Sequence, residues 1–311
     1  MHAFLFPGQG AQTIGMGKDL AENFSVSKDV FEEVNDALEQ DLSSLIWDGD
    51  IDTLTLTENA QPALMATSIA AVKALESEGI EFNQASFIAG HSLGEYSALC
   101  AAGSLNIHDT AKLLRIRGKA MQDAVPIGIG AMAAILGLDF NTVNKIAKSI
   151  GNDQVCQAAN DNDPGQVVIS GHKEAVEQTI ELAKAAGAKR AILLPVSAPF
   201  HCALMQPAAD AMSEALDGID LESPSVPLVA NVKASQETNG SIIKELLIEQ
   251  VTGSVRWRES IEYISLHGVT DVFEIGAGKA LSGMVRRIDR EINVNQVFDT
   301  NSVNAAVLKL K

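Results

Sequence analysis

The chain has few cysteines and few basic residues for its 311 positions. Its three cysteines, Cys100, Cys156 and Cys202, form no C-x-x-C pair, so the sequence predicts neither a disulfide framework nor a zinc site or other metal site. Lysine and arginine together number 23 against 40 aspartates and glutamates, and the formal net charge is −17. Because phosphate binding requires clustered basic residues, this balance argues against a nucleic-acid partner.

The sequence also lacks any hydrophobic run long enough to span a membrane, and it has no basic leader at its start. Pro7 interrupts the opening apolar residues before a signal-peptide core could form. We therefore expect a soluble, cytoplasmic protein with no membrane partner. Hydrophobic residues make up 46% of the chain and charged residues 20%, which is ordinary for a well-packed globular enzyme.

Short apolar runs alternate with helical patterns along the chain. Residues 87–89, 228–232 and 272–275 have the composition of buried parallel strands. Residues 62–77 and 110–122 have the periodicity of helices. This alternation predicts an α/β fold with a parallel sheet.

The order of the expected elements changes after residue 126. Residues 131–196 have, in turn, the patterns of a strand, a helix, two strands, a helix and a strand, which is the split order of a ferredoxin-like unit. We therefore expect a large subdomain formed by residues 1–126 and 199–311, and an inserted small subdomain formed by residues 127–198.

A G-x-S-x-G motif, Gly90-His91-Ser92-Leu93-Gly94, follows one of the expected strands and precedes a helical pattern. This context is typical of a nucleophile elbow, a turn so tight that the positions two residues before and after the serine must lack a Cβ. The free N–H groups at the start of the following helix would favour an oxyanion. The motif could arise by chance, but its context favours Ser92 as a nucleophile.

An elbow serine needs a base to accept its proton, and His201 is the best of six histidines. It follows an expected strand end, where ligand-facing side chains collect in open α/β sheets. The alternative is a histidine that only caps or packs at the subdomain junction. His91 is expected to point away from the serine. The chain order, serine before histidine, agrees with hydrolase-type folds and favours catalysis.

Arg117 lies on the apolar face of the expected helix 110–122, beside Leu114 and Met121. A buried arginine requires an anion. This anion is either an internal carboxylate or the carboxylate of a substrate, which the planar guanidinium can bind through two hydrogen bonds. The sequence leaves both alternatives open.

The loop of residues 7–12 is rich in glycine but does not match a nucleotide-binding loop, because Met16 occupies the position of the P-loop lysine. This loop belongs to a set of six motifs that occur in order over almost the whole chain. The motifs are FPGQGAQ at 6–12, QPAL at 61–64, GHSLGEY at 90–96, RIRGKAM at 115–121, NDNDPGQ at 160–166 and SAPFH at 197–201. Together they resemble the malonyl-CoA:acyl carrier protein transacylases, a family of acyltransferases.

The resemblance implies an α/β-hydrolase-like core with the ferredoxin-like subdomain inserted, and an active site in the cleft between them. It implies that Ser92 carries the acyl group and that His201 is its base. It assigns the oxyanion hole to Gln9 and the N–H of Leu93. In place of an acidic third member, the backbone carbonyl of Gln250 would orient the imidazole.

The resemblance further implies that Arg117 binds the malonyl carboxylate and that Met121, Asn160 and Phe200 contribute to the substrate site. Phe200 beside the histidine fits the malonyl-selective pattern. One departure is Ala277, where the family more often has proline, and this concerns the stiffness of a loop. The implied substrate is the coenzyme A thioester malonyl-CoA and the implied acceptor is holo acyl carrier protein, with no cofactor. We expect a monomer that serves fatty acid or polyketide synthesis.

Acyl carrier proteins are strongly acidic, so a chain of net charge −17 needs local basic surface to bind one. Eight residues are candidates: Lys189, Arg190, Arg256, Arg258, Lys279, Arg286, Arg287 and Arg290. The alternative is that these residues are scattered. Two other functions remain open at this point. A serine esterase or thioesterase would discharge the acyl group to water, and a docking module would form no acyl-enzyme.

Overall fold

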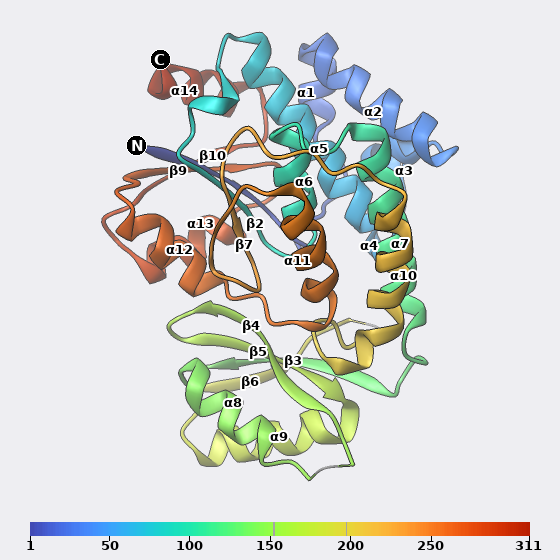
Figure 1. Cartoon of the computed structure of the whole chain (residues 1–311), viewed down its shortest axis with the longest axis vertical. Helices are drawn as coiled ribbons and strands as arrows, with labels where there is room; N and C mark the ends of the chain where they lie inside the picture. Colours follow the sequence, from blue (N-terminus) through green and yellow to red (C-terminus); the bar gives the residue numbers. More distant parts are fainter. Residues whose placement is uncertain (152, 197) are drawn as a thin grey trace.

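The structure is a computed structural model that describes residues 1–151, 153–196 and 198–311. Ser197, the first residue of the SAPFH motif, lies outside the described residues. Figure 1 shows a large upper part, which contains both ends of the chain, and a smaller part below it. No described helix combines the length and hydropathy that a membrane crossing requires.

The large part is built on a six-stranded sheet of order β10-β9-β1-β2-β7-β8. Its strands are β1 (His2–Phe6), β2 (Phe87–Gly90), β7 (Leu228–Ala230), β8 (Ser235–Glu237), β9 (Asp271–Ile275) and β10 (Asn293–Val297). All neighbouring pairs are parallel except β7 and β8, which form an antiparallel edge. The predicted parallel sheet is confirmed, and the short strand β8 is an addition that the sequence pattern did not indicate.

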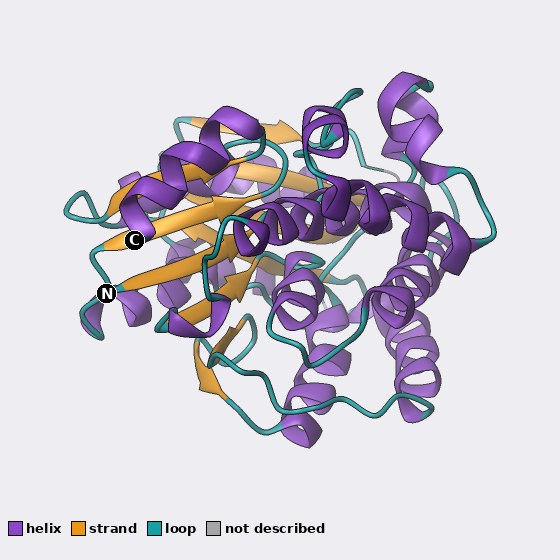
Figure 2. Ribbon diagram, turned by 90° about the horizontal axis from the view of Figure 1, so that it is seen from above, coloured by secondary structure: helices purple, strands orange, loops and turns teal. Residues whose placement is uncertain are grey.

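Helices cover both faces of this sheet, as the view from above shows (Figure 2). The helices of the large part are α1 (Lys18–Asn23), α2 (Ser25–Leu38), α3 (Leu42–Asp48), α4 (Ile51–Thr55), α5 (Thr57–Ser77), α6 (Gly94–Ala101), α7 (Ile107–Asp123), α10 (Gln206–Asp217), α11 (Gly240–Thr252), α12 (Trp257–Leu266), α13 (Ala280–Ile288) and α14 (Thr300–Leu310), with short 3-10 turns at Phe82–Gln84 and Ala203–Met205. Along β1, Phe4 and Phe6 belong to the core on one face, whereas Ala3 and Leu5 belong to the core on the other. The central strand is therefore buried on both sides, as parallel sheets require.

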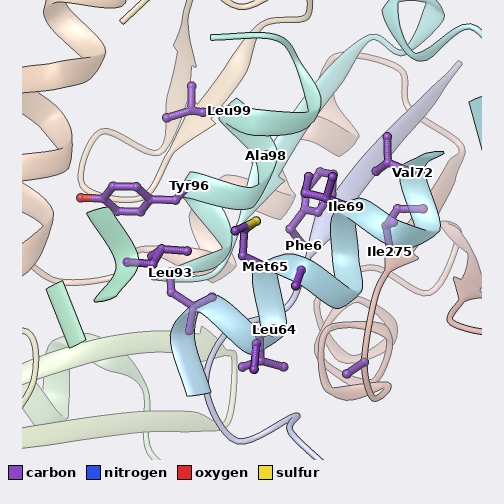
Figure 3. Close-up of a cluster of buried hydrophobic side chains, with 14 of the residues drawn as sticks. Phe6, Leu64, Met65, Ile69, Val72, Leu93, Tyr96, Ala98, Leu99 and Ile275 are labelled. Atoms are coloured by element: carbon purple, nitrogen blue, oxygen red, sulfur yellow. The ribbon is translucent and has the colours of Figure 1, made fainter. Parts of the chain in front are cut away.

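Helix α5 is buried along most of its length and packs against α6 and α7. In the close-up of this core, Leu64, Met65 and Ile69 lie beside Phe6 and Leu93 (Figure 3). The helix begins at Thr57, five residues before the start that the sequence pattern indicated, so Pro62 lies inside it. A proline there removes one helical hydrogen bond, and burial of the surrounding turns offsets that loss.

The lower part of Figure 1 contains a four-stranded antiparallel sheet of order β4-β5-β3-β6. Its elements are β3 (Gly130–Leu136), α8 (Phe140–Lys148), β4 (Cys156–Asp163), β5 (Gln166–His172), α9 (Lys173–Ala185) and β6 (Arg190–Leu193). Element order and strand order are those of the ferredoxin-like split unit, and this sheet has a hydrophobic core of its own. All these elements fall within residues 127–198, and we keep that range as the proposed small subdomain.

Strand β4 joins the small sheet to the large part of the molecule. The N–H of Asp161 donates to the carbonyl of Val255 over 2.9 Å, and the N–H of Val255 donates to the carbonyl of Ala159 over 2.8 Å. Asp161 and Asp163 also form ion pairs with Arg258 and Arg287, at 2.9 and 2.7 Å. The edge of β4 is therefore fixed against the segment that connects α11 to α12.

Candidate active site

Ser92 lies on the turn between β2 and α6, with a φ of 54° in the left-handed region. A Cβ on Gly90 would lie 1.9 Å from the carbonyl carbon of Gly94, and a Cβ on Gly94 would lie 2.3 Å from the carbonyl oxygen of Phe6. No side chain can be accommodated at such distances. The strand–turn–helix arrangement that the motif predicted is therefore present, and the two glycines are what allow it.

The backbone of Ser92 is held on both sides by side-chain amides. Its N–H donates to Asn231 Oδ1 over 2.8 Å, and its carbonyl accepts from Gln250 Nε2 over 3.0 Å. Asn231 Nδ2 also donates to the carbonyl of Gly90 over 2.6 Å. These contacts fix the turn in a conformation that a serine rarely adopts.

His201 is buried, and its Nε2 lies 2.8 Å from Ser92 Oγ. Its Nδ1 lies 2.8 Å from the backbone carbonyl oxygen of Gln250. Since a carbonyl only accepts, Nδ1 carries the proton, and Nε2 is left to accept the proton of the serine hydroxyl. Burial, together with the positive charge of Arg117, lowers the pKa of His201 to about 3. The imidazole is therefore a neutral base.

Arg117, on α7, is 1% exposed and directs its guanidinium towards Ser92. Nη2 donates to Ser92 Oγ over 3.1 Å and to Gln250 Oε1 over 2.8 Å, and Nη1 donates to Gln61 Oε1 over 2.8 Å. All three acceptors are neutral. Within the part of the chain that the structure describes, Arg117 takes part in none of the ion pairs. The internal salt bridge that the sequence left open is not formed.

A cavity of about 530 Å³ opens over Ser92, between the two sheets. Besides Ser92, His201 and Arg117, the expected site residues that line it are Gln9, Leu93, Met121, Asn160 and Phe200. Gln9 Nε2 donates to Thr57 Oγ1 over 3.3 Å at the start of α5. Residues of the small sheet, Met132 and Val168 among them, form the opposite wall. Gln250, on α11, is not among the residues that line the cavity and reaches the site through its hydrogen bonds to Ser92, His201 and Arg117.

His91 points away from Ser92, as expected, and its Nε2 lies 2.9 Å from Asn162 Oδ1 on β4. Both side chains line the cavity, so His91 contributes to its shape. Burial lowers the pKa of His91 and keeps it neutral. Among the described residues, no three histidine, cysteine, aspartate or glutamate side chains are grouped so that they could hold a metal ion.

Several of the basic residues expected to attract an acidic partner are already paired. Arg256 pairs with Glu259, and Arg258 and Arg287 pair with Asp161 and Asp163 of β4. Arg286 and Arg290 line a different cavity, at the start of β9 and β10 and away from Ser92. Of the remaining candidates, Lys279 is exposed and directly precedes the cavity-lining residues 280–281, whereas Lys189 and Arg190 are exposed at the start of β6.

Three buried residues of the site were given no role from the sequence. Gln61 and Glu95 lie within the QPAL and GHSLGEY motifs, so their positions were marked but their contacts were not. Asn231 lies at the end of β7, and nothing in its local sequence sets it apart. Glu95 accepts from the N–H of Asn231 over 3.1 Å and from Gln250 Nε2. Burial raises the pKa of Glu95 to about 7.

The chain is similar to known proteins over almost its whole length. Residues 3–287 match the family described as the acyl transferase domain. The chain is 49% identical over 310 residues to the malonyl CoA-acyl carrier protein transacylase of Bacillus subtilis, covering 99% of this chain and 97% of that protein. Its structure is similar to the crystal structure of an acyl-carrier-protein-S-malonyltransferase from Bartonella henselae, with a TM-score of 0.97 and 99% of both chains covered. The two sequences are 55% identical.

A further similar structure is a malonyl-transacylase solved in complex with its type II PKS acyl-carrier protein, at 43% identity and a TM-score of 0.96, with 99% of both chains covered. The fold class predicted from the sequence is thereby confirmed, and the similarity extends over the large part and the small sheet alike. The chain belongs to the acyl transferase family and, within it, to the malonyl-CoA:acyl carrier protein transacylases.

Proposed function

We propose that this chain transfers a malonyl group from malonyl-CoA to the pantetheine thiol of holo acyl carrier protein, through an ester on Ser92. The observation that carries the proposal is the position of Ser92 Oγ, which lies 2.8 Å from His201 Nε2 and 3.1 Å from Arg117 Nη2. One oxygen thus contacts both a neutral base and a buried cation. A hydrolase needs the base, and only an acidic acyl group needs the cation.

In the first half-reaction, His201 Nε2 takes the proton of Ser92 as Oγ attacks the thioester carbonyl carbon. The oxyanion that forms is stabilised by the N–H groups of Gln9 and Leu93. The C–S bond then breaks, and the proton on His201 passes to the leaving thiolate. The products are free coenzyme A and malonyl-Ser92.

In the second half-reaction, the pantetheine thiol of the carrier protein enters the same cavity. His201 removes its proton, the sulfur attacks the ester carbonyl, and the proton returns to Ser92 Oγ as the C–O bond breaks. One thioester is consumed and one is formed, so the cycle needs no cofactor. The backbone carbonyl of Gln250 holds the imidazole in the same tautomer through both steps.

Arg117 binds the malonyl carboxylate in this proposal, because its charge is buried and its hydrogen-bond partners in the free protein are neutral. A substrate carboxylate would supply the missing negative charge. Phe200, Met121 and Asn160 complete the wall of the substrate site. The limited space beside Phe200 favours malonyl over branched acyl groups.

In this proposal the acidic carrier protein meets the exposed residues Lys189, Arg190 and Lys279, and this local charge offsets the long-range repulsion between two acidic proteins. We propose that the cycle takes place in the cytoplasm and on a monomer. Whether the carrier belongs to fatty acid or to polyketide synthesis depends on the partner supplied.

Incubation with malonyl-labelled malonyl-CoA tests this function directly. We expect label on the protein that is absent in Ser92→Ala, and transfer of that label to holo acyl carrier protein when it is added. Release of the label as free malonate at the same rate with and without carrier would show a thioesterase instead. A protein that never carries label would contradict the proposal.

A further inference from the structure

Glu95 lies directly under the active site and takes no part in the mechanism described above. Its carboxylate is 1% exposed, and both of its oxygens accept hydrogen bonds. Oε1 accepts from the backbone N–H of Asn231 over 3.1 Å, and Oε2 accepts from Gln250 Nε2. The two residues that Glu95 contacts are the two that hold the backbone of Ser92.

Gln250 connects this carboxylate to the rest of the site. Its Nε2 donates both to Glu95 and to the carbonyl of Ser92, its Oε1 accepts from Arg117 Nη2, and its backbone carbonyl accepts from His201 Nδ1. Arg117 can only donate and the Ser92 carbonyl can only accept, so one orientation of the Gln250 amide satisfies all its contacts. Glu95, which only accepts when ionised, requires that same orientation.

We propose that Glu95 is a positioning residue for malonyl transfer, which fixes the amide of Gln250 so that its oxygen faces Arg117 and its nitrogen faces Ser92. This inference rests on the proposed function. It adds a role for Glu95, which through the Gln250 amide fixes the position of Arg117 relative to Ser92. Burial raises the pKa of Glu95, and the positive charge of Arg117 on the other side of Gln250 acts in the opposite direction.

According to the proposal, both terminal side-chain atoms at position 95 must be hydrogen-bond acceptors, and a side chain of the same size is not sufficient. Glu95→Gln has nearly the same shape, but its NH2 group must face one of two donors, the N–H of Asn231 or the NH2 of Gln250. Rotating the amide of Gln250 would relieve this conflict, but it would turn the NH2 group of Gln250 towards Arg117. Because a guanidinium has no acceptor, two donors would then face each other. A residue that only filled space would tolerate the exchange.

The test compares transfer of malonyl and acetyl groups from their coenzyme A thioesters to holo acyl carrier protein. For Glu95→Gln we expect kcat/KM for malonyl-CoA to fall tenfold or more, with a rise in KM, and the malonyl-to-acetyl ratio to fall with it. The matched control is Glu274→Gln. Glu274 is an equally enclosed glutamate that accepts from the N–H groups of Leu281 and Ser282 and has no contact with Arg117. The Glu274→Gln variant should lower thermal stability and leave the malonyl-to-acetyl ratio of kcat/KM unchanged.

A second pair of variants decides the question even where Glu95→Gln folds poorly. Gln250→Glu alone places two carboxylates against each other, whereas the double variant Glu95→Gln, Gln250→Glu again pairs one donor with one acceptor, the donor now being at 95. Adding Glu95→Gln to Gln250→Glu should therefore raise malonyl transfer at least threefold. Both variants should stay below wild type for malonyl and acetyl groups alike, because a carboxylate at 250 cannot donate to the carbonyl of Ser92 and supplies Arg117 with an internal negative charge.

The outcomes separate cleanly. If wild type transfers malonyl and Glu95→Gln keeps the wild-type malonyl-to-acetyl ratio, the positioning role is overturned while the proposed function stands. Loss rather than gain on adding Glu95→Gln to Gln250→Glu overturns it as well. If wild type itself transfers no malonyl, the proposed function is wrong and this inference is wrong with it.

Discussion

Ser92 and His201 both have left-handed backbones, with φ angles of 54° and 58°, and their reactive atoms Oγ and Nε2 lie 2.8 Å apart. Such a conformation costs a non-glycine residue about 1–3 kcal/mol and persists only where the surroundings fix it. At Ser92 those surroundings are the hydrogen bonds to Asn231 and Gln250, and at His201 they include the bond from Nδ1 to the Gln250 carbonyl. The strain is therefore held by one network, which keeps the pair in reactive geometry before substrate arrives.

The base should be indispensable to the first half-reaction. His201→Ala removes the imidazole nitrogen that accepts the proton of Ser92, and we expect the rate of protein labelling by malonyl-CoA to fall by about 10²–10⁴. Rapid-quench measurement of malonyl-Ser92 checks this. A loss of less than tenfold would mean that another group or water removes the proton.

The guanidinium should discriminate between acyl groups. Removal of its charge in Arg117→Ala leaves a malonyl carboxylate unpaired in the cavity, which costs on the order of 2–5 kcal/mol in malonyl transfer and much less in acetyl transfer. Arg117→Lys is the informative control, because a lysine keeps the charge but cannot donate to Gln61, Ser92 and Gln250 at once. Equal losses for malonyl-CoA and acetyl-CoA would refute the assignment of the carboxylate site.

The residues that we propose as catalytic could be located from the sequence because each lies in a local pattern. Ser92 is marked by its two glycines, Arg117 by its place on a helix face, and His201 by its position after a strand. The contacts that hold them are not local. Asn231 lies 139 residues from Ser92, and the side chain of Gln250 reaches a carbonyl 158 residues away. No periodicity of strands or helices encodes such pairs.

The fold shows the same division. The two sheets follow from apolar runs and their order, whereas the edge strand β8 has three residues and no alternation that could indicate it. The helical periodicity of the sequence placed the start of α5 at Pro62, and proline is a residue type that is common in a first helical turn. Tertiary burial overrides that signal and carries the helix back to Thr57, which brings Gln61 onto the helix opposite Arg117.

His201 should stay uncharged over the whole working range. Its pKa is lowered to about 3 by burial and by the charge of Arg117, so the imidazole is neutral wherever the pH is well above that value. We expect its ¹⁵N chemical shifts to remain those of the Nδ1–H tautomer between pH 5 and 8. Arg117→Gln removes one of the causes that lower the pKa of His201 and should therefore raise this pKa. Titration of wild-type His201 near pH 6.5 would contradict this account.

Glu95 should make stability depend on pH in a definite direction. Its pKa is raised from the ordinary 4.5 to about 7, so the folded protein binds its proton more tightly than the unfolded chain does. The free energy of unfolding of wild type should therefore decrease, relative to Glu95→Gln, as the pH rises from 4.5 to 7, by on the order of 3 kcal/mol. Urea unfolding at several pH values measures the difference, and a difference that is constant or grows with pH would exclude the raised pKa.

The two ion pairs that fix β4, Asp161–Arg258 and Asp163–Arg287, should contribute differently to the free energy of unfolding despite their similar lengths. The carboxylate of Asp161 is 1% exposed and its pair with Arg258, itself 26% exposed, is largely shielded, whereas Arg287 beside Asp163 is 53% exposed. Asp163 keeps a second hydrogen bond, from the N–H of Gly165, when its arginine is removed. Arg258→Ala leaves Asp161 a buried charge without its partner and should cost about 3 kcal/mol of stability, against less than about 1 kcal/mol for Arg287→Ala. Because Asn160 and Asn162 of β4 line the cavity, Arg258→Ala should also raise KM for malonyl-CoA. Equal losses of stability in the two variants would show that burial of an ion pair does not determine its contribution to stability.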